Sequence, residues 1–435
     1  MLRLKKPSLK WALKSLEQSD AYLFPGPFEF DAISSDENQL VQTLANRDVL
    51  DYDKHGVRPY RSFLVPKSPM GFRIATQLDP IDTILTNAAL YEIAHELEAA
   101  RSPSARTSTF SYRLKTETDD GQLYDPAGAW WEFHTRTKEI AESSDITHVV
   151  VTDIADFYPS IYLHHAETVL YEAVSSSDRQ THAEFLLNYV RHMNHIQTHK
   201  GLPIGPIFSA PIAELVLDTL DSELAAKGVV FTRYLDDIRI FCRSEGEAYK
   251  ELAHVADFLY QQRHFRLNEN KTDILERGKF NKRYAREHDP RVPTPNFDQL
   301  VEALNLQGSP YSAFSLDELD AEELEQLKNT YWEQLLNDEL KKRHIDYGRI
   351  AFVLNILSAL GNTDVVDTLL APANLRKLVP RLSSIVQYLE RVAHLLEVEK
   401  RGEVSGKLLN ALSDDVIPGY SVRREKASFP SGCES

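Results

Sequence analysis

The chain has few cysteines and no long apolar run. Cys242 and Cys433 are the only cysteines among 435 residues and lie far apart, so we expect a reducing compartment and no disulfide framework. No apolar run approaches the roughly 20 residues of a membrane span, and residues 1–6 lack the apolar segment of a secretory signal. We therefore expect a cytoplasmic protein without a membrane partner, long enough for two or three domains.

Positive charge is also scarce. Lys and Arg number 49 against 65 Asp and Glu, a formal net charge of −16, which argues against a uniformly polyanion-binding surface. The distribution is uneven. Residues 54–73 contain Lys and Arg but no Asp or Glu, whereas residues 315–325 contain six acidic residues and no basic ones. Any polyanion should therefore bind locally and in a salt-sensitive way.

The most informative segment is Tyr234-Leu235-Asp236-Asp237, which interrupts the apolar run of residues 229–241. Strand-like flanks around a short polar pair predict a β-hairpin with carboxylates at its tip. An Asp pair in a turn is often only a turn, because turns favour Asp. Two adjacent carboxylates repel each other unless water or a cation neutralises them.

A second carboxylate occurs in a matching context. Residues 148–152 form a β-branched run that ends in Asp153, which a polar and aromatic turn follows. Strand ends that bring Asp153 beside Asp236 and Asp237 would create a site for two Mg²⁺ ions, or Mn²⁺ in their place, about 3.5–4 Å apart. Such a site clamps the attacking and leaving oxygens in phosphoryl transfer.

Together these segments resemble a reverse transcriptase, an RNA-directed DNA polymerase. Asp153 to Tyr158 resembles the family's first metal motif, Gly201 to Ser209 its template and nucleotide loop, and Tyr234 to Asp237 its tyrosine-x-aspartate-aspartate turn. Residues 63–73 are similar to the fingers hairpin and residues 267–272 to the later lysine motif. The resemblance spans Arg58 to Lys279, about half of the chain.

The resemblance implies roles for individual residues. Asp153 and Asp236 would be the main metal ligands, with Asp237 and the backbone carbonyl of Ile154 as further oxygens. Lys271 would donate a proton to the pyrophosphate or stabilise it. An aromatic ring at Tyr158 would exclude a 2′-hydroxyl and so select dNTPs. The expected nucleotide-binding residues are Lys67, Arg73, Tyr158, Gly205 and Tyr234, and the expected template and primer contacts are Pro203, Ile204 and Ser209.

One position departs from the family pattern. The family most often has glutamine where this chain has Ile204. An apolar side chain cannot hydrogen-bond a template strand, so this departure puts ordinary template handling in doubt.

The expected fold class is α+β, with right-hand polymerase fingers and palm, an antiparallel palm sheet with helices, and an all-α C-terminal domain. We expect an N-terminal extension and fingers over 1–142, the palm over 143–279, a Pro-rich linker over 280–296, helical repeats over 297–400 and a flexible tail over 401–435. Three prolines within residues 290–295 predict the linker, and apolar spacings of three and four predict the helices.

The helical C-terminal region carries no ribonuclease H or endonuclease pattern. It resembles that of bacterial abortive-infection and other defence-associated reverse transcriptases, which implies a role in antiphage defence. The partners expected are dNTPs, an RNA template or an associated non-coding RNA, the DNA product, and either a second copy of the chain or partner defence proteins.

Some members of that group start DNA synthesis from a protein hydroxyl, and the tyrosine candidates here are Tyr311, Tyr331, Tyr347, Tyr388 and Tyr420. Two alternatives remain open. An RNA-dependent RNA polymerase shares palm geometry but usually has glycine before its aspartate pair. A non-catalytic scaffold subunit of a defence complex would keep the fold without the chemistry.

Overall fold

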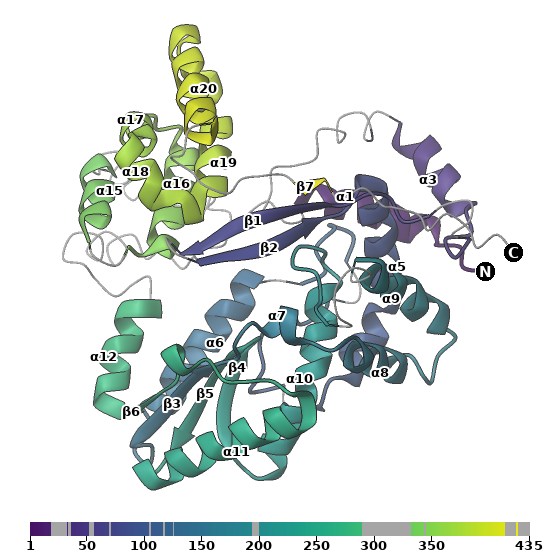
Figure 1. Ribbon diagram of the computed structural model, residues 1–435, viewed down its shortest axis with the longest axis vertical. Helices are drawn as coiled ribbons and strands as arrows, with labels where there is room; N and C mark the ends of the chain where they lie inside the picture. Colours follow the sequence, from purple (N-terminus) through teal and green to yellow (C-terminus); the bar gives the residue numbers. More distant parts are fainter. Residues whose placement is uncertain are drawn as a thin grey trace, which may run out of the picture.

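The computed structural model describes residues 1–18, 33, 36–51, 56–68, 71–103, 106–115, 118–124, 126–193, 200–288, 332–342, 345–413 and 423–424. Antiparallel sheets and many helices make up this part of the chain, which confirms the expected mixture of the two (Figure 1). Within these residues, no helix has both the length and the apolar character needed to cross a bilayer.

A four-stranded antiparallel sheet lies in the lower half of the molecule in Figure 1. Its order is β4 (Val230–Tyr234), β5 (Asp237–Cys242), β3 (His148–Asp153) and β6 (Asp273–Glu276). Because strand side chains alternate between faces, β3 and β5 each contribute to two cores. Val150, Ile238 and Ile240 belong to the main core, while Val149 and Phe241 belong to a smaller one.

Helices cover both faces of this sheet. The main core includes residues of α10 (Ser209–Ala226) and α11 (Glu245–Arg263). The smaller core includes Ala141 of α6 (Pro126–Ala141) and Phe280 of α12 (Arg277–His288). The short elements α7 (Phe157–Ser160) and η2 (Glu269–Lys271) lie near the end of β3 that carries Asp153.

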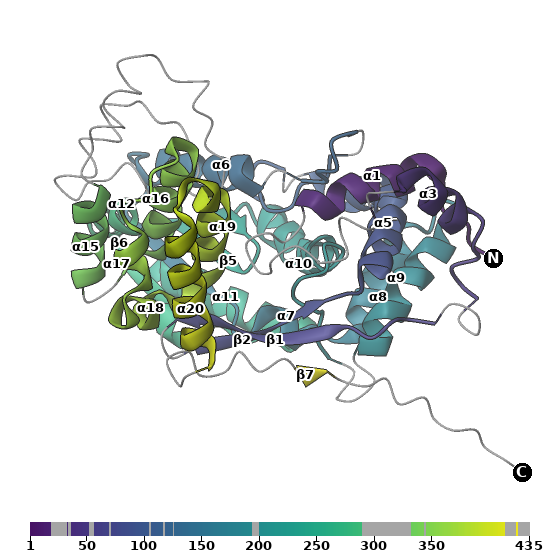
Figure 2. The same ribbon diagram turned by 90° about the horizontal axis from the view of Figure 1, so that it is seen from above.

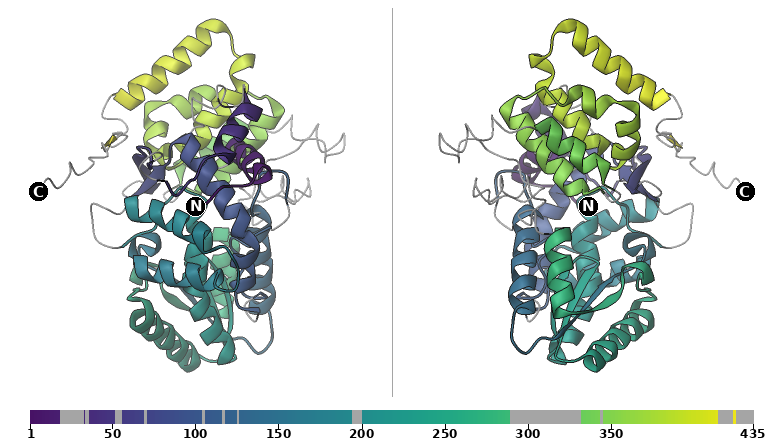
Figure 3. Two further views of the ribbon diagram at one scale, coloured as in Figure 1. Left: turned by 90° about the vertical axis from the view of Figure 1, so that its right-hand side faces the viewer. Right: turned by 90° about the vertical axis from the view of Figure 1, so that its left-hand side faces the viewer.

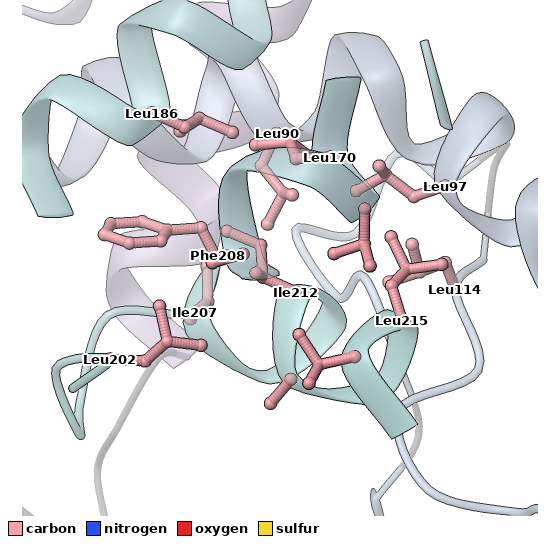
Figure 4. Packing of buried hydrophobic residues seen from close by; sticks show 14 of the residues in the cluster. Leu90, Leu97, Leu114, Leu170, Leu186, Leu202, Ile207, Phe208, Ile212 and Leu215 are labelled. Atoms are coloured by element: carbon pink, nitrogen blue, oxygen red, sulfur yellow. The ribbon is translucent and has the colours of Figure 1, made fainter. Parts of the chain in front are cut away.

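The main core extends from the sheet into an N-terminal helical layer. Leucines of α5 (Pro80–Ala100), α8 (Leu163–Ala173) and α9 (Gln180–Met193) pack around the first turns of α10, where Phe208, Ile212 and Leu215 are buried (Figure 4). The helices α1 (Lys6–Gln18) and α3 (Glu37–Ala45) complete this layer. Burial of this apolar surface is the main favourable contribution to the stability of the region.

A second sheet contains the hairpin of β1 (Arg61–Ser68) and β2 (Gly71–Gln77), which are antiparallel. The short strand β7 (Arg423–Arg424) pairs with the start of β1. Seen from above, the hairpin runs between the N-terminal helices and the C-terminal helices (Figure 2).

The C-terminal helices form a separate core, which lies above the four-stranded sheet in Figure 3. Residues of several helices are fully buried in it, among them Ile356, Leu369 and Ile385. The elements are α15 (Trp332–Lys341), α16 (Tyr347–Leu360), α17 (Val366–Leu370), α18 (Pro372–Leu378), η4 (Val379–Arg381), α19 (Leu382–Val392), η5 (Ala393–Leu395) and α20 (Val398–Ser413).

Two expected boundaries are wrong. The linker cannot begin at residue 280, because α12 continues to His288 and Phe280 is buried against the sheet. The flexible tail cannot begin at residue 401, because α20 is helical to Ser413 and buries Val404 in the C-terminal core. In both cases tertiary packing of an apolar side chain extends a helix through a sequence that is polar on average. Residues 289–296 and 414–422 lie outside the described residues.

Candidate active site

The register of the four-stranded sheet brings three carboxylates to one end of it. Asp153, the last residue of β3, is the cross-strand partner of Asp237, the first residue of β5. Asp236 precedes Asp237 in the tight turn between β4 and β5, and its carbonyl accepts a hydrogen bond from the amide of Ile154 at 3.3 Å. The three residues are therefore neighbours, although more than 80 positions separate Asp153 from the other two.

The proximity of these carboxylates changes the acidity of one of them. Burial, followed by the charges of Asp237 and Asp153, raises the pKa of Asp236 to about 7, and the charge of Lys271 offsets this only in part. A carboxyl group with that pKa is protonated in about half of the molecules at pH 7 unless a cation lies beside it. The end of the sheet is thus short of positive charge.

Asp153 itself has two polar partners from the segment that follows α11. Lys271 Nζ lies 3.0 Å from Asp153 Oδ2, and Asn268 Nδ2 donates to the same oxygen at 3.1 Å. The amide of Asn268 donates to the carbonyl of Asp153 at 2.7 Å. On the other strand, Arg239 Nη2 lies 3.6 Å from Asp237 Oδ1. Protein cations therefore contact two of the three carboxylates.

The donor chemistry of this cluster fits a divalent metal ion, since Mg²⁺ and Mn²⁺ prefer carboxylate and carbonyl oxygens. Among the described residues, however, no three His, Cys, Asp or Glu side chains converge as a ready metal site. Asp153 instead contacts Lys271 and Asn268. Asp153, Asp236 and Asp237 offer the carboxylate oxygens that such an ion would need, and their role as its ligands stays a prediction. The amide of the buried Ile154 donates to the carbonyl of Asp236. Among the described residues, no contact defines a role for the carbonyl of Ile154.

The glycine loop, residues 201–209, is hydrogen-bonded to the segment that follows β3 and to β2. Gly201 and Gly205 have φ angles of 102° and 129°, a region that favours glycine. The amide of Leu202 donates to the carbonyl of Tyr158 at 2.9 Å, and the carbonyl of Ile204 accepts from the amide of Thr76 on β2 at 2.6 Å. The loop therefore joins Tyr158, just beyond β3, to the β1–β2 hairpin.

The other loop residues differ in exposure. Pro203, Ile204 and Gly205 are half-buried, whereas Ser209, at the start of α10, is buried and its hydroxyl has no hydrogen-bond partner among the described residues. The ring of Tyr158 is half-buried and lies edge-on to Phe157, with 5.6 Å between the ring centroids.

The hairpin carries the two basic residues expected to bind nucleotide phosphates. Arg73 lies on β2 opposite Val65 of β1, and its side chain is half-buried. Lys67 lies on β1, and its side chain is outside the described residues. The contact of the loop with Thr76 attaches this hairpin to the candidate site.

The family comparison agrees with this arrangement of motifs. A family model described as reverse transcriptase (RNA-dependent DNA polymerase) matches residues 65–297, more than half of the chain. The chain belongs to the reverse transcriptase family. No curated protein sequence matches it.

Solved structures similar to this reverse transcriptase family member include three telomerase structures from two Candida species. Apo telomerase from Candida tropicalis is 12% identical, with a TM-score of 0.37, over 86% of this chain and 70% of that one. Telomerase from Candida albicans, in complex with a fragment of telomeric RNA, is 12% identical, with a TM-score of 0.36, over 79% and 67%. A C. tropicalis telomerase truncated from its C-terminal domain is 11% identical, with a TM-score of 0.34, over 56% of this chain, which spans 55% of that one.

The tyrosine of the reverse transcriptase turn is packed in an aromatic cluster. Tyr234 is the cross-strand partner of Asp237, and its ring lies edge-on to Trp130 of α6 at 4.9 Å between centroids. Phe133 and Tyr112 lie within 6.4 Å of the same ring. This cluster fixes the last residue of β4 directly before the carboxylate turn.

Of the priming candidates, the structure describes two, both in the C-terminal helices. Tyr388 is buried, its hydroxyl donates to the carbonyl of Asn362 at 2.7 Å, and burial raises its pKa. This placement disfavours Tyr388 as a primer, since its oxygen is inaccessible. Tyr347 is half-buried, and its hydroxyl donates to the carbonyl of Lys377 at 3.1 Å. Tyr311, Tyr331 and Tyr420 lie outside the described residues.

Several residues beside the reverse transcriptase turn were not predicted from the sequence. Arg233 and Arg239 lie within the apolar strands β4 and β5 and are buried. An arginine within an apolar strand sequence indicates a buried polar contact, because a buried arginine needs carboxylate or carbonyl partners. Glu214 and Asp221 lie seven residues apart on the largely apolar helix α10 and likewise indicate buried polar contacts. Their partners were not predictable, because the pairing depends on the tertiary arrangement.

A cationic and aromatic surface adjoins the glycine loop. We call it the Tyr162 surface. Lys200 Nζ lies 4.1 Å from the centroid of the Tyr162 ring, and the ring of His264 lies 5.8 Å from that ring. His165 contacts both the guanidinium of Arg263 and the ring of His164. Lys200 directly precedes Gly201, so this surface begins where the loop begins. Its members are Tyr162, His164, His165, Lys200, Arg263 and His264.

Proposed function

We propose that the protein is an RNA-directed DNA polymerase that adds dNTPs to a 3′ end by phosphoryl transfer at Asp153, Asp236 and Asp237. One observation carries the proposal: the sheet register makes Asp153 the cross-strand neighbour of the Asp236–Asp237 turn. Burial, followed by the charges of Asp237 and Asp153, raises the pKa of Asp236 to about 7. Such a cluster is costly unless a cation neutralises it.

In this reaction the 3′-hydroxyl loses its proton to solvent and its oxygen forms a bond to the α-phosphorus. The bond from that phosphorus to the bridging oxygen breaks, and pyrophosphate leaves. Two divalent ions, Mg²⁺ by preference and Mn²⁺ as a substitute, would be held by the three carboxylates and would stabilise charge on the phosphoryl oxygens. Lys271, whose side chain is 47% exposed and reaches Asp153, would move to the pyrophosphate and give it a proton. Arg73 and Lys67 would hold the triphosphate from the hairpin.

Tyr158 and the glycine loop would enclose the sugar and the base of the incoming nucleotide. The hydrogen bond from the amide of Leu202 to the carbonyl of Tyr158 keeps the backbone of Tyr158 beside the loop, which supports exclusion of a 2′-hydroxyl by this residue and therefore dNTP selection. The half-buried, apolar Ile204 can contact a template base only through its shape or its backbone. These features support synthesis with a less strictly held template.

The Tyr162 surface supports a path for single-stranded nucleic acid into this site. Rings accept stacked bases, and Lys200 and Arg263 neutralise phosphates. Binding of nucleic acid at this surface is compatible with the chain's formal net charge of −16, because such binding depends on the charges close to the phosphates. The expected strand is an RNA template or an associated RNA.

The helical C-terminal core supports a place among the defence-associated reverse transcriptases of bacteria. In that role Tyr347 is the described candidate for protein priming, because its hydroxyl is less enclosed than that of Tyr388. A labelled nucleotide that stays on the protein after nuclease digestion and is released by protease would establish protein priming.

The test of the main proposal is incorporation of labelled dNTPs in the presence of Mg²⁺ or Mn²⁺, with and without added RNA. Wild-type protein should make nuclease-sensitive DNA, and Asp236→Asn should make none. Asp257→Asn, an exposed change on α11, is the matched control and should retain full activity. Incorporation of NTPs in preference to dNTPs would instead identify an RNA polymerase.

One observation favours a second candidate function, a non-catalytic scaffold. Lys271 contacts Asp153 and Arg239 contacts Asp237, so protein cations neutralise part of the cluster without a metal ion. If the chain is a scaffold, Asp236→Asn should keep its full biological effect. If it is a polymerase, that effect should be lost together with DNA synthesis.

A further inference from the structure

A buried group of polar residues is hydrogen-bonded to the backbone of the carboxylate turn. Four of its members are fully buried, namely Arg233, Glu214, Asp221 and Ser111, and the fifth, Arg101, is 3% exposed. We call these five residues the turn support. They come from three parts of the chain: the segment between α5 and α6, the helix α10, and the strand β4.

The turn needs support because of its backbone conformation. Leu235, the residue before Asp236, has a φ angle of 54°. This left-handed region is unfavourable for a leucine. If the chain relaxed to an ordinary turn, the peptide between Leu235 and Asp236 would rotate, and the Asp236 carboxylate would move with it.

Two side chains of the turn support bind the backbone of Leu235 directly. The amide of Leu235 donates to Ser111 Oγ at 2.7 Å, and Arg233 Nη1 donates to the carbonyl of Leu235 at 2.9 Å. Both polar groups of the strained residue are therefore satisfied by side chains of the turn support.

Glu214 fixes both of these side chains. Its carboxylate accepts hydrogen bonds from the Ser111 hydroxyl and from Arg233 Nη2, the latter at 3.0 Å. Arg101 Nη2 contacts the same carboxylate at 3.0 Å, and Arg233 Nε donates to Asp221 Oδ1 at 2.7 Å. Two arginines thus face two carboxylates.

The charge state of Glu214 agrees with this arrangement. Burial alone would raise the pKa of Glu214, but the charges of Arg233 and Arg101 outweigh it and hold that pKa below its usual range. Glu214 therefore stays ionised and keeps its acceptor role. Because a buried charge that loses its partner is strongly unfavourable, loss of Arg233 or Arg101 should destabilise the arrangement around Glu214.

We propose that Ser111 and Arg233 are positioning residues for the reaction, held in place by Glu214, and that they keep Leu235 left-handed so that Asp236 can bind a metal ion beside Asp153. This inference rests on the proposed function. It also links two parts of the site, because Glu214 lies on α10, five residues after Ser209 at the end of the glycine loop.

The test compares Ser111→Ala with a matched variant on β4. Thr232→Val removes a buried hydrogen bond between Thr232 Oγ1 and Thr137 Oγ1, 2.8 Å apart, one residue before Arg233 and without contact to the turn backbone. Both variants lose one buried hydroxyl. They are compared in thermal unfolding, in Mn²⁺ binding by titration calorimetry, and in steady-state dNTP incorporation.

For Ser111→Ala we expect Mn²⁺ binding at least fivefold weaker and kcat at least tenfold lower, with KM for dNTP within twofold of wild type. Thr232→Val should lower the unfolding midpoint by a similar amount and leave Mn²⁺ affinity and kcat within twofold. Arg233→Lys, which keeps the charge but loses the forked geometry, should behave like Ser111→Ala. Equal Mn²⁺ affinities in Ser111→Ala and Thr232→Val would overturn the inference.

The binding measurement separates this inference from the proposed function. A chain that binds Mn²⁺ through Asp236, loses that affinity in Ser111→Ala, and makes no DNA would refute the polymerase and support the positioning role. A chain that makes DNA with unchanged Mn²⁺ affinity in both variants would support the polymerase and refute the positioning role.

Discussion

Lys271 Nζ and Asp153 Oδ2 lie 3.0 Å apart, and this ion pair joins the residue expected to serve the leaving group to the first carboxylate of the site. Lys271 is half-exposed, whereas Asp153 is 4% exposed. A half-exposed cation thus contacts a buried anion. The same oxygen also accepts from Asn268, so Asp153 keeps a partner when Lys271 departs.

Replacing Lys271 should separate these two roles. In Lys271→Ala we expect Mn²⁺ binding without nucleotide to become two- to tenfold tighter, because a competing cation is removed, and kcat for dNTP incorporation to fall about 10²-fold, the usual size of a lost proton donor. Calorimetry and steady-state kinetics measure the two effects. Lys250→Ala, at a position 81% exposed, should change neither. Unchanged kcat in Lys271→Ala would remove this residue from the reaction.

Asp236 should make stability depend on pH in the metal-free protein. Its folded pKa of about 7 lies above the unfolded value of about 3.9, so the folded state binds the extra proton and is destabilised as pH rises through this window. Asp236→Asn should therefore raise the free energy of unfolding at pH 8 by up to about 4 kcal/mol.

The gain from Asp236→Asn should shrink as pH falls below 7 and vanish near pH 4. Denaturant unfolding in EDTA at several pH values measures it, with Asp257→Asn as an exposed control. A gain that is the same at pH 5 and pH 8 would show that Asp236 does not carry the charge strain of the site.

Tyr158 should decide the choice between dNTP and NTP. In Tyr158→Ala, loss of the ring beside Leu202 opens space for a 2′-hydroxyl, and kcat/KM for NTPs should rise at least tenfold relative to dNTPs. Tyr158→Phe keeps the ring and should keep the selectivity. Competition between labelled nucleotides gives the ratio. Selectivity that survives in Tyr158→Ala would place the sugar elsewhere.

The Tyr162 surface should contribute to binding of single-stranded nucleic acid. Lys200→Ala should weaken binding of a 20-nucleotide strand at least threefold and reduce the salt dependence by about one phosphate contact. Fluorescence anisotropy at several salt concentrations measures both quantities. Lys250→Ala, on the exposed face of α11, is the charge-matched control. Equal losses in the two variants would indicate only a general charge effect.

The two described tyrosines of the C-terminal core should respond differently to loss of the hydroxyl. Tyr388→Phe removes the bond to Asn362 and should cost about 1 kcal/mol of stability without changing nucleotide labelling of the protein. Tyr347→Phe should remove that label if Tyr347 primes synthesis. Mass spectrometry of the digested, labelled protein identifies the attached residue. Label retained in Tyr347→Phe would assign priming to another residue.

The local features of the site were evident in the sequence, because they depend on short-range chemistry. The alternating and β-branched runs around Asp153 and Asp236 predicted strands that end in carboxylates. Gly201 and Gly205 predicted close backbone approach, and both adopt φ angles that favour glycine. These patterns needed no knowledge of distant partners.

Tertiary structure decided which groups neutralise the carboxylates and which hold the turn. The partner of Asp153 lies 118 positions away at Lys271, and the acceptor for the amide of Leu235 lies 124 positions away at Ser111. Burial of Phe280 and Val404 likewise extended two helices into segments expected to be linker and tail. A chain's local pattern specifies strands, turns and glycine positions, whereas the pairing of buried charges depends on the fold that excludes water from them.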